Sequence, residues 1–516
     1  MDIQLRVIAK KVFPTVMSLI VIVSVGLAWA DAEKPRQDSS AVAATNHTIR
    51  LKGKTIAYSA TAGFISICNK TTGAPEGEIF FVYYKNNEGR DVKKRPVTFA
   101  FNGGPGAASM YLHLAALGPR TIPRSADGTT LLPPPYSLHD NENTLLDFTD
   151  LVFIDPIGTG FSRAVAGVDP RRFWGVKEDV NAITDFVFQF LTAYGRVLSP
   201  LFIAGESYGG VRGVGLAKAL QDAGLYPMGI VLISPALDLQ NIQWSSLGDR
   251  AMLLSLPSYC AAAWHHQKVA PRLRKDLGKT LEEVRKWTTT DLLPAFWKGD
   301  SLTDVEREGV AKRLSEYTGI DPRWIMEKNI RIREREFAGQ LLKNENRSIS
   351  VYDSRVTALG PYTGDDNDGG AFLLAGPLKT AMTDYISREL NFRTERRYLS
   401  GNSEVYLDWN WESGRVPPVN ADSINTGYPD SSNDFAQALN RCHFLKVFIA
   451  SGIFDLEVPY DSVRYTINHL DIPKERKNNI SIKTYPGGHM HYANPEAHRK
   501  LREDIRTFYE NTLKGL

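Results

Sequence analysis

The stretch at 201–210 constrains the fold more than any other part of the chain. Residues 200–204 form a short apolar run, as expected for a buried strand. Gly-Glu-Ser-Tyr-Gly follows at 205–209 and fits G-x-S-x-G, the pattern of a sharp turn from a strand into a helix with a serine at its tip. Because the serine backbone is strained there, the residues two positions to either side must lack a Cβ atom. A helix expected over 211–223 directs its positive end toward the Ser207 hydroxyl, so the stretch predicts a nucleophile.

Length and composition limit the classes of protein to consider. A chain of 516 residues predicts one large domain with an insertion, or two domains. Its 43% hydrophobic and 23% charged residues are typical of a globular protein, and a net charge of +3 gives no reason to expect a nucleic-acid partner. The three cysteines, Cys68, Cys260 and Cys442, allow at most one disulfide, and their spacing matches no metal site.

The N-terminus has the layout of a secretory signal peptide. Basic residues precede an apolar run at 12–27, and Ala28-Trp29-Ala30 offers a cleavage site, so we expect a signal peptide over 1–30. A retained membrane anchor is the alternative, since the run approaches the length of a membrane span. Either reading places the rest of the chain outside the cytoplasm, without stable membrane association once the signal is cleaved. The polar residues 31–48 are expected to form a flexible leader.

The pattern beyond the leader predicts a core interrupted by an insertion. In the first core part, 49–240, antiparallel strands precede buried strands that alternate with helices, which predicts a mixed, mostly parallel sheet. Residues 241–430 are more charged and helix-like, and we expect them to form a largely helical cap. The strand pattern returns in the second core part, 431–516, which ends in an amphipathic helix.

Side chains suited to nucleophilic catalysis each follow a predicted strand. Ser207, Asp455 and His489 can converge because the carboxyl ends of strands share one edge of an α/β sheet. His489 would accept the proton of Ser207, and Asp455 would hold the imidazole and balance its charge. In a chain with 41 glycines the serine motif alone could also be a structural turn. Neighbouring acids and bases that compete for the partner roles are Glu457, Asp461, His491 and His498.

An earlier loop offers a place for an oxyanion. Asn-Gly-Gly-Pro-Gly at 102–106 ends a predicted strand, and such a loop presents backbone N–H groups in a concave arrangement. A plain glycine–proline turn is the alternative interpretation.

These motifs together resemble the serine carboxypeptidase family of α/β-hydrolases. The matching blocks lie at 102–106, 155–162, 205–210 and 488–490. The resemblance covers roughly residues 50–240 and 440–516, and it implies an α/β-hydrolase fold with the predicted cap as an insertion.

The resemblance also implies roles for residues around the serine. Gly104 and Tyr208 would donate backbone N–H groups to the oxyanion, while Asn102, Gly103 and Glu206 would hold the terminal carboxylate of a peptide. Glu206 can bind a carboxylate only when protonated, because two ionised carboxylates repel, so we expect activity to favour acidic pH. No metal or organic cofactor is implied.

The chain departs from the family at several positions. Ala107 stands where a cysteine is frequent, Ala116 stands where a glutamate often assists carboxylate binding, and Val458-Pro459 replaces the usual Cys-Asn. The few cysteines and short leader resemble bacterial members, which implies a periplasmic or secreted protein.

The sequence therefore predicts an exported serine exopeptidase that releases C-terminal residues from peptides through an acyl-enzyme. An esterase or acyltransferase with the same residues is the first alternative, and a non-catalytic binding protein is the second. Neither the side-chain preference nor the oligomeric state follows from the sequence.

Overall fold

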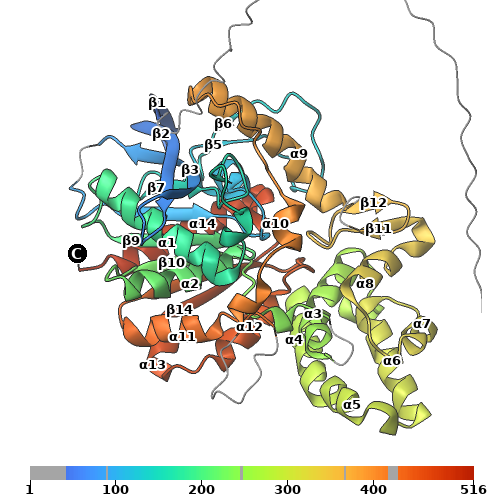
Figure 1. The fold of residues 1–516 in the computed structure, drawn as a ribbon. Coiled ribbons are helices and arrows are strands. Elements are labelled where there is room, and N and C mark those ends of the chain that lie inside the picture. Colours follow the sequence, from blue (N-terminus) through green and yellow to red (C-terminus); the bar gives the residue numbers. More distant parts are fainter. Residues whose placement is uncertain (1–41, 89–90, 245–247, 365–367, 416–427, 516) are drawn as a thin grey trace, which may run out of the picture. The chain divides into compact units, whose positions relative to one another are not determined.

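A mixed sheet forms the centre of the part of the chain that the structure describes (Figure 1). This computed structural model describes residues 42–516 except 89–90, 245–247, 365–367, 416–427 and 516. The predicted signal peptide and most of the predicted leader thus lie outside the described residues. Two units divide the chain, 1–39 and 40–516, and every described residue falls in the second.

The ten-stranded sheet of the described residues has the order β1-β2-β3-β7-β4-β9-β10-β13-β14, with β8 paired to β3. Pairing is antiparallel from β1 to β7 and parallel from β7 to β14, which confirms the predicted fold. The strands are β1 (Ala43–Leu51), β2 (Lys54–Cys68), β3 (Pro75–Asn86), β4 (Val97–Phe101), β7 (Asp150–Ile154), β8 (Arg163–Ala164), β9 (Leu201–Glu206), β10 (Gly229–Ile233), β13 (Lys446–Gly452) and β14 (Ile480–Tyr485). Two short hairpins lie outside it: β5 (Arg120–Thr121) with β6 (His139–Asp140), and β11 (Arg347–Ile349) with β12 (Thr357–Leu359).

Strand β1 corrects the predicted leader, which was expected to run to residue 48. Residues from Ala43 onward pair with β2, and alternate side chains face inward along the strand. The inward positions of its first half are Ala43, Thr45 and His47, which are small or polar. The sequence therefore shows no alternation of apolar and polar residues here, and this part of the strand could not be predicted.

Helices cover both faces of the sheet, as the alternation of strands and helices predicts (Figure 1). One apolar cluster joins one face to α1 (Val176–Ala193), α2 (Gly209–Asp222), α11 (Ser432–Arg441) and α12 (Tyr460–His469). A second cluster joins the other face to α9 (Gly369–Asp384) and α14 (Pro495–Thr512). The short helices α10 (Ser403–Leu407) and α13 (Lys474–Lys477) complete this part.

The insertion has an apolar core of its own. Its helices are α3 (Arg250–His265), α4 (Leu277–Trp287), α5 (Leu293–Lys298), α6 (Asp304–Thr318), α7 (Pro322–Glu327) and α8 (Glu334–Gln340). Their buried side chains form a separate cluster that also takes in Phe454 and Leu456 from the sheet domain. Helix α9 belongs instead to the core cluster of the sheet, through Leu374, Leu378 and Met382. The helical cap therefore ends earlier than the predicted boundary at 430.

Among the described residues no helix combines the length and the apolar character that a bilayer crossing requires. All three cysteines are unpaired, with Cys260 and Cys442 buried and Cys68 half-buried.

Candidate active site

Ser207 occupies the turn between β9 and α2 that its motif predicts. Its φ of 60° lies in the left-handed region, which costs free energy for a residue with a side chain. A Cβ added to Gly205 would lie 2.2 Å from the Gly209 carbonyl oxygen, so this turn requires glycine. The turn is also held from β10, because the Ser207 N–H donates to the Ile233 carbonyl at 3.0 Å. The sequence thus folds locally to expose a serine hydroxyl at the start of a helix.

The predicted acid and base meet at the ends of neighbouring strands. His489 Nδ1 lies 2.8 Å from Asp455 Oδ2, and both side chains are buried. The other carboxylate oxygen of Asp455 accepts the Val458 N–H at 2.8 Å. This geometry favours Asp455 and His489 over the competing residues. Of these, Asp461 pairs with Arg285, His491 stacks on Tyr485 and His498 contacts the Ala116 carbonyl.

The environment of His489 favours its charged form. Burial by itself lowers the pKa of an imidazole, but Asp455, and then Glu206 and Glu457, outweigh it and raise the pKa of His489 to about 9. Asp455 thus stabilises the imidazolium, which is the form that His489 would take after it accepts a proton. This is the role that the sequence predicts for Asp455.

Ser207 and His489 both adjoin the end of β10. Ser207 bonds to Ile233 as described, and the hydroxyl of the next residue, Ser234, donates to the His489 carbonyl at 2.8 Å. Within the described residues no hydrogen bond joins the Ser207 hydroxyl to the imidazole. The structure therefore brings the acid and the base into contact and brings the serine to the adjoining strand end.

The loop at 102–106 faces the first turn of α2. A Cβ added to Gly103 would lie 2.4 Å from the Tyr208 nitrogen, so the two backbones are in close contact. Gly104 is exposed at this place, with a φ of 100° that favours glycine. Neither the Gly104 nor the Tyr208 N–H donates to another described residue. Two backbone donors on adjoining loops are an arrangement that can stabilise an oxyanion.

Glu206 is a buried carboxyl with two polar neighbours. Asn102 Nδ2 donates to it at 2.7 Å, and the Tyr492 hydroxyl lies 2.9 Å from each of its oxygens. Burial raises the pKa of Glu206 to about 7, although His489, Tyr492 and Asn102 oppose the rise. The carboxyl directly before Ser207 is thus protonated at acidic pH, as its predicted role in carboxylate binding requires.

Tyr492 is a site residue that the sequence did not reveal. It is fully buried and its carbonyl accepts a hydrogen bond from Arg124. The same guanidinium donates to the Ala115 carbonyl at 2.6 Å, beside the position where the family often has glutamate. Ala116 itself is buried, and its carbonyl contacts His498 and accepts a hydrogen bond from Asn141 Nδ2 at 3.1 Å. The only sequence signal for Tyr492 is its place three residues after His489.

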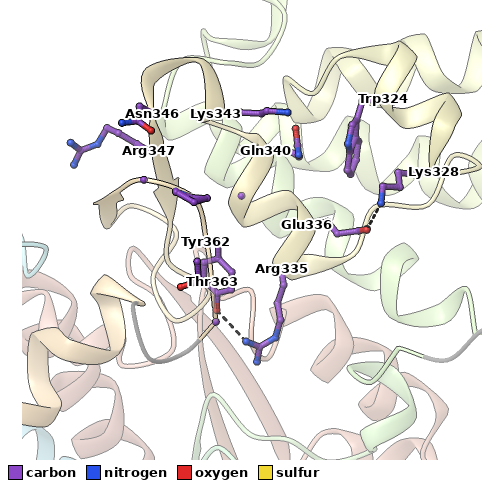
Figure 2. A pocket seen from close by; sticks show the side chains of 14 residues that line it. Trp324, Lys328, Arg335, Glu336, Gln340, Lys343, Asn346, Arg347, Tyr362 and Thr363 are labelled. Carbon is purple, nitrogen blue, oxygen red and sulfur yellow. Dashed lines mark hydrogen bonds and ion pairs between the residues drawn. The ribbon is translucent and has the colours of Figure 1, made fainter.

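A cavity of about 570 Å³ in the insertion lies apart from this site (Figure 2). Figure 2 shows it between α7, α8 and the β11–β12 hairpin, with Lys328 paired to Glu336 at 2.7 Å and Arg335 bonded to the Tyr362 hydroxyl. None of the predicted site residues lines it. We therefore assign the chemistry to the strand ends and not to this cavity.

Comparison with known proteins agrees with the resemblance. Residues 52–229 match the model of the family described as serine carboxypeptidase. Over this third of its length the chain is similar to serine carboxypeptidases. The matched segment holds the loop at 102–106 and Ser207, whereas Asp455 and His489 lie beyond it, so their assignment depends on the geometry.

Pheromone-processing carboxypeptidases from fungi are among the relatives found. A pheromone-processing carboxypeptidase of Saccharomyces cerevisiae is 32% identical over 143 residues, which cover 26% of this chain and 18% of the relative. The pheromone-processing carboxypeptidase of Aspergillus niger is 33% identical over 148 residues, which cover 28% of this chain and 22% of the relative. This chain thus spans about a fifth of the length of these curated relatives. The crystal structure of the prohormone-processing carboxypeptidase from Saccharomyces cerevisiae superimposes with a TM-score of 0.55 at 16% identity, covering 88% of this chain and 91% of that one, which supports the shared fold.

Proposed function

We propose that this chain is an exported serine exopeptidase that removes C-terminal residues from peptides through an acyl-enzyme. The observation that carries the proposal is the buried Glu206, held by Asn102 and Tyr492 directly before a serine in the strained turn of a nucleophile. A carboxyl that is protonated below about pH 7 suits recognition of a terminal carboxylate.

The triad then performs acyl transfer in two stages. His489 accepts the proton of Ser207 as its oxygen attacks the carbonyl of the last peptide bond, and it returns the proton to the leaving amine. Asp455 keeps Nδ1 of the imidazole protonated, so that Nε2 faces the serine. The Gly104 and Tyr208 N–H groups stabilise the oxyanion. Water repeats the sequence on the acyl-enzyme, and no metal or organic cofactor is needed for these steps.

Carboxylate recognition fixes the position of the cut. Protonated Glu206 donates a hydrogen bond to the substrate carboxylate, with Asn102 and the Gly103 N–H as further donors. Placed one residue before the nucleophile, this group holds the terminal residue next to the scissile bond. Binding weakens as pH rises because the ionised Glu206 repels the carboxylate.

An esterase or acyltransferase remains the second candidate, favoured by one observation. Ala116 carries no carboxyl where the family often has glutamate, so the carboxylate site has one acid fewer.

Relative rates on matched substrates test the two candidates. We expect kcat/KM for a peptide with a free C-terminus to exceed that for its C-terminal amide and for a simple ester. A preference for the ester, with no difference between peptide and amide, would contradict exopeptidase activity. Labelling by a serine-directed phosphonate should be lost in Ser207→Ala, and an unlabelled wild type would instead indicate a non-catalytic binding protein. Export is tested by sequencing the N-terminus of the mature protein, which we expect to begin after Ala30.

A further inference from the structure

A short segment of the insertion touches the loops of both the acid and the base. Residues 350–354, Ser-Val-Tyr-Asp-Ser, follow β11, and we name them the bracing segment. The Val351 carbonyl accepts the N–H groups of Leu456 at 2.9 Å and Glu457 at 3.1 Å. The Ser354 N–H and hydroxyl both donate to the Phe454 carbonyl at 3.0 Å. The bracing segment thus fixes the backbone on either side of Asp455.

The same segment holds the loop of the base. The Tyr352 carbonyl accepts the His489 N–H at 2.6 Å, and Asp353 Oδ2 accepts the Gly488 N–H at 3.1 Å. The two backbones are so close that a Cβ added to Gly488 would lie 2.1 Å from the Tyr352 carbonyl oxygen. Because His489 itself is bonded through its backbone, a shift of the segment must move the imidazole.

Buried charges hold the bracing segment in place. Asp353 pairs with Arg355 at 2.6 Å, and the guanidinium of Arg355 lies over the ring of Phe454. Asp368 accepts the Val351 N–H at 2.8 Å and also the Ser350 hydroxyl. Charge-assisted hydrogen bonds of this kind are stronger than neutral ones and depend more on geometry. These bonds therefore fix the conformation of the bracing segment.

We propose that the bracing segment aligns His489 with Asp455, with Asp353 as the positioning residue. The proposal rests on the triad of the proposed function, and it gives the insertion a part in catalysis besides covering the core. Asp353 lies against the base loop without touching a reacting atom, so it acts through the backbone of Gly488 and His489. Displacement of a catalytic group by about 1 Å can cost roughly 100-fold in rate.

Removal of the Asp353 carboxylate tests this role. In Asp353→Ala we expect kcat per active site, counted by phosphonate titration, to fall roughly 10- to 100-fold, with KM for the same peptide unchanged. The acid limb of kcat should move to lower pH, because a looser contact with Asp455 raises the pKa of His489 less. The titratable and charged groups that face His489 or its loop are Glu206, Tyr352, Asp353 with Arg355, Asp455, Glu457 and His491.

Two further variants separate positioning from general stability. Asp353→Asn keeps an oxygen that can accept the Gly488 N–H but loses the charge paired with Arg355, so we expect its kcat to lie between those of the wild type and Asp353→Ala. Asp249→Ala removes an ion pair of the same insertion, to Arg331 at 2.6 Å, which includes no residue of the bracing segment or of the catalytic loops. It should leave kcat and the acid limb unchanged.

The outcomes distinguish this inference from the proposed function. A wild type labelled at Ser207, together with an Asp353→Ala variant of unchanged kcat per site and unchanged acid limb, would overturn the inference alone. If Asp353→Ala does not fold, Ser354→Ala serves in its place, because it removes one of the two donors to Phe454 and should lower kcat by a few-fold at constant KM. An unchanged kcat in that variant would overturn the inference as well.

Discussion

Replacement of Glu206 by glutamine gives the sharpest test of carboxylate recognition. Glutamine has nearly the shape of glutamic acid and donates a hydrogen bond, but it does not ionise. With a pKa of about 7, Glu206 is ~99% protonated at about pH 5 and only ~1% protonated at about pH 9. KM for a peptide with a free C-terminus should therefore rise roughly tenfold for each pH unit above about pH 8 in the wild type.

The variant should lose this slope. In Glu206→Gln we expect a KM that stays within about threefold of its value at pH 5 across the range, since the donor no longer titrates. A hydrogen bond to a charged acceptor contributes about 1.5–3 kcal/mol, so at acidic pH wild-type kcat/KM should favour the free acid over its amide by roughly 10- to 150-fold. The amide serves as the control, because it has no carboxylate to be repelled and its KM should be flat in both proteins.

Initial rates with both substrates from about pH 5 to pH 9 give the required constants, and thermal unfolding confirms that the variant is folded. The substrate carboxylate stays ionised throughout this range, so any slope belongs to the enzyme. A wild-type KM that does not rise above neutral pH, or a Glu206→Gln variant that keeps the wild-type slope, would refute the reasoning.

Two other substitutions probe the surroundings of this site. Tyr492→Phe removes a hydroxyl that favours the ionised carboxyl, so the pKa of Glu206 should rise and the increase in KM should begin at higher pH; an unmoved KM profile would exclude Tyr492 from the site. Gly205→Ala places a methyl group 2.2 Å from the Gly209 carbonyl oxygen and should lower the Tm sharply or prevent folding. Gly213→Ala, in α2, meets its nearest atom at 3.4 Å and should keep or raise the Tm, because alanine favours a helix over glycine by about 0.5–1 kcal/mol. Equal effects of the two alanines would contradict the packing argument.

Local patterns predicted those parts of the fold and site in which a motif ends a strand. The spacing of Gly205 and Ser207 predicts the turn, and the glycine-rich ends of later strands favour Asp455 and His489 over their neighbours. The turn and the sheet follow from these patterns because a strained turn permits few residue types, and because parallel strands end at one edge. The catalytic roles of Asp455 and His489 stay predictions.

Contacts between segments that are distant in the sequence produce no local sequence pattern and could not be predicted. Tyr492 reaches Glu206 across 286 residues, and Asp353 reaches Gly488 across 135. Neither contact changes the hydrophobic pattern of the segments that form it, so the contact is seen only in the folded structure. The many charges of residues 241–430 predict that α9 belongs to the cap, although its apolar side chains pack in the core cluster of the sheet. A hydrophobic pattern shows that one face of a helix is buried, but it does not show which element covers that face.

The proposed carboxylate site and the proposed triad influence each other through charge, and their roles set opposing demands on pH. Glu206 must be protonated to bind a carboxylate, whereas His489 must be neutral to accept the serine proton, yet the pKa of His489 is about 9 and that of Glu206 about 7. In the free protein a single proton shared by the two groups therefore lies mainly on His489, and protonated Glu206 is the minority form. An ionised substrate carboxylate favours that minority form, because it accepts a hydrogen bond from protonated Glu206, and binding thus transfers the proton away from the base.

The same coupling gives Glu206→Gln a second effect, on a substrate that has no carboxylate. The negative charge of Glu206 helps to raise the pKa of His489, so its removal should lower that pKa. Hydrolysis of the C-terminal amide by Glu206→Gln should then extend to lower pH than in the wild type, although the substrate never touches a carboxylate site. Asn102→Ala is the matched control, because it removes the hydrogen bond that Asn102 Nδ2 donates to Glu206 and leaves the charge of Glu206 in place. If the acid limb for the amide is the same in Glu206→Gln and the wild type, the two sites titrate independently, and substrate binding has no influence on the proton of the base.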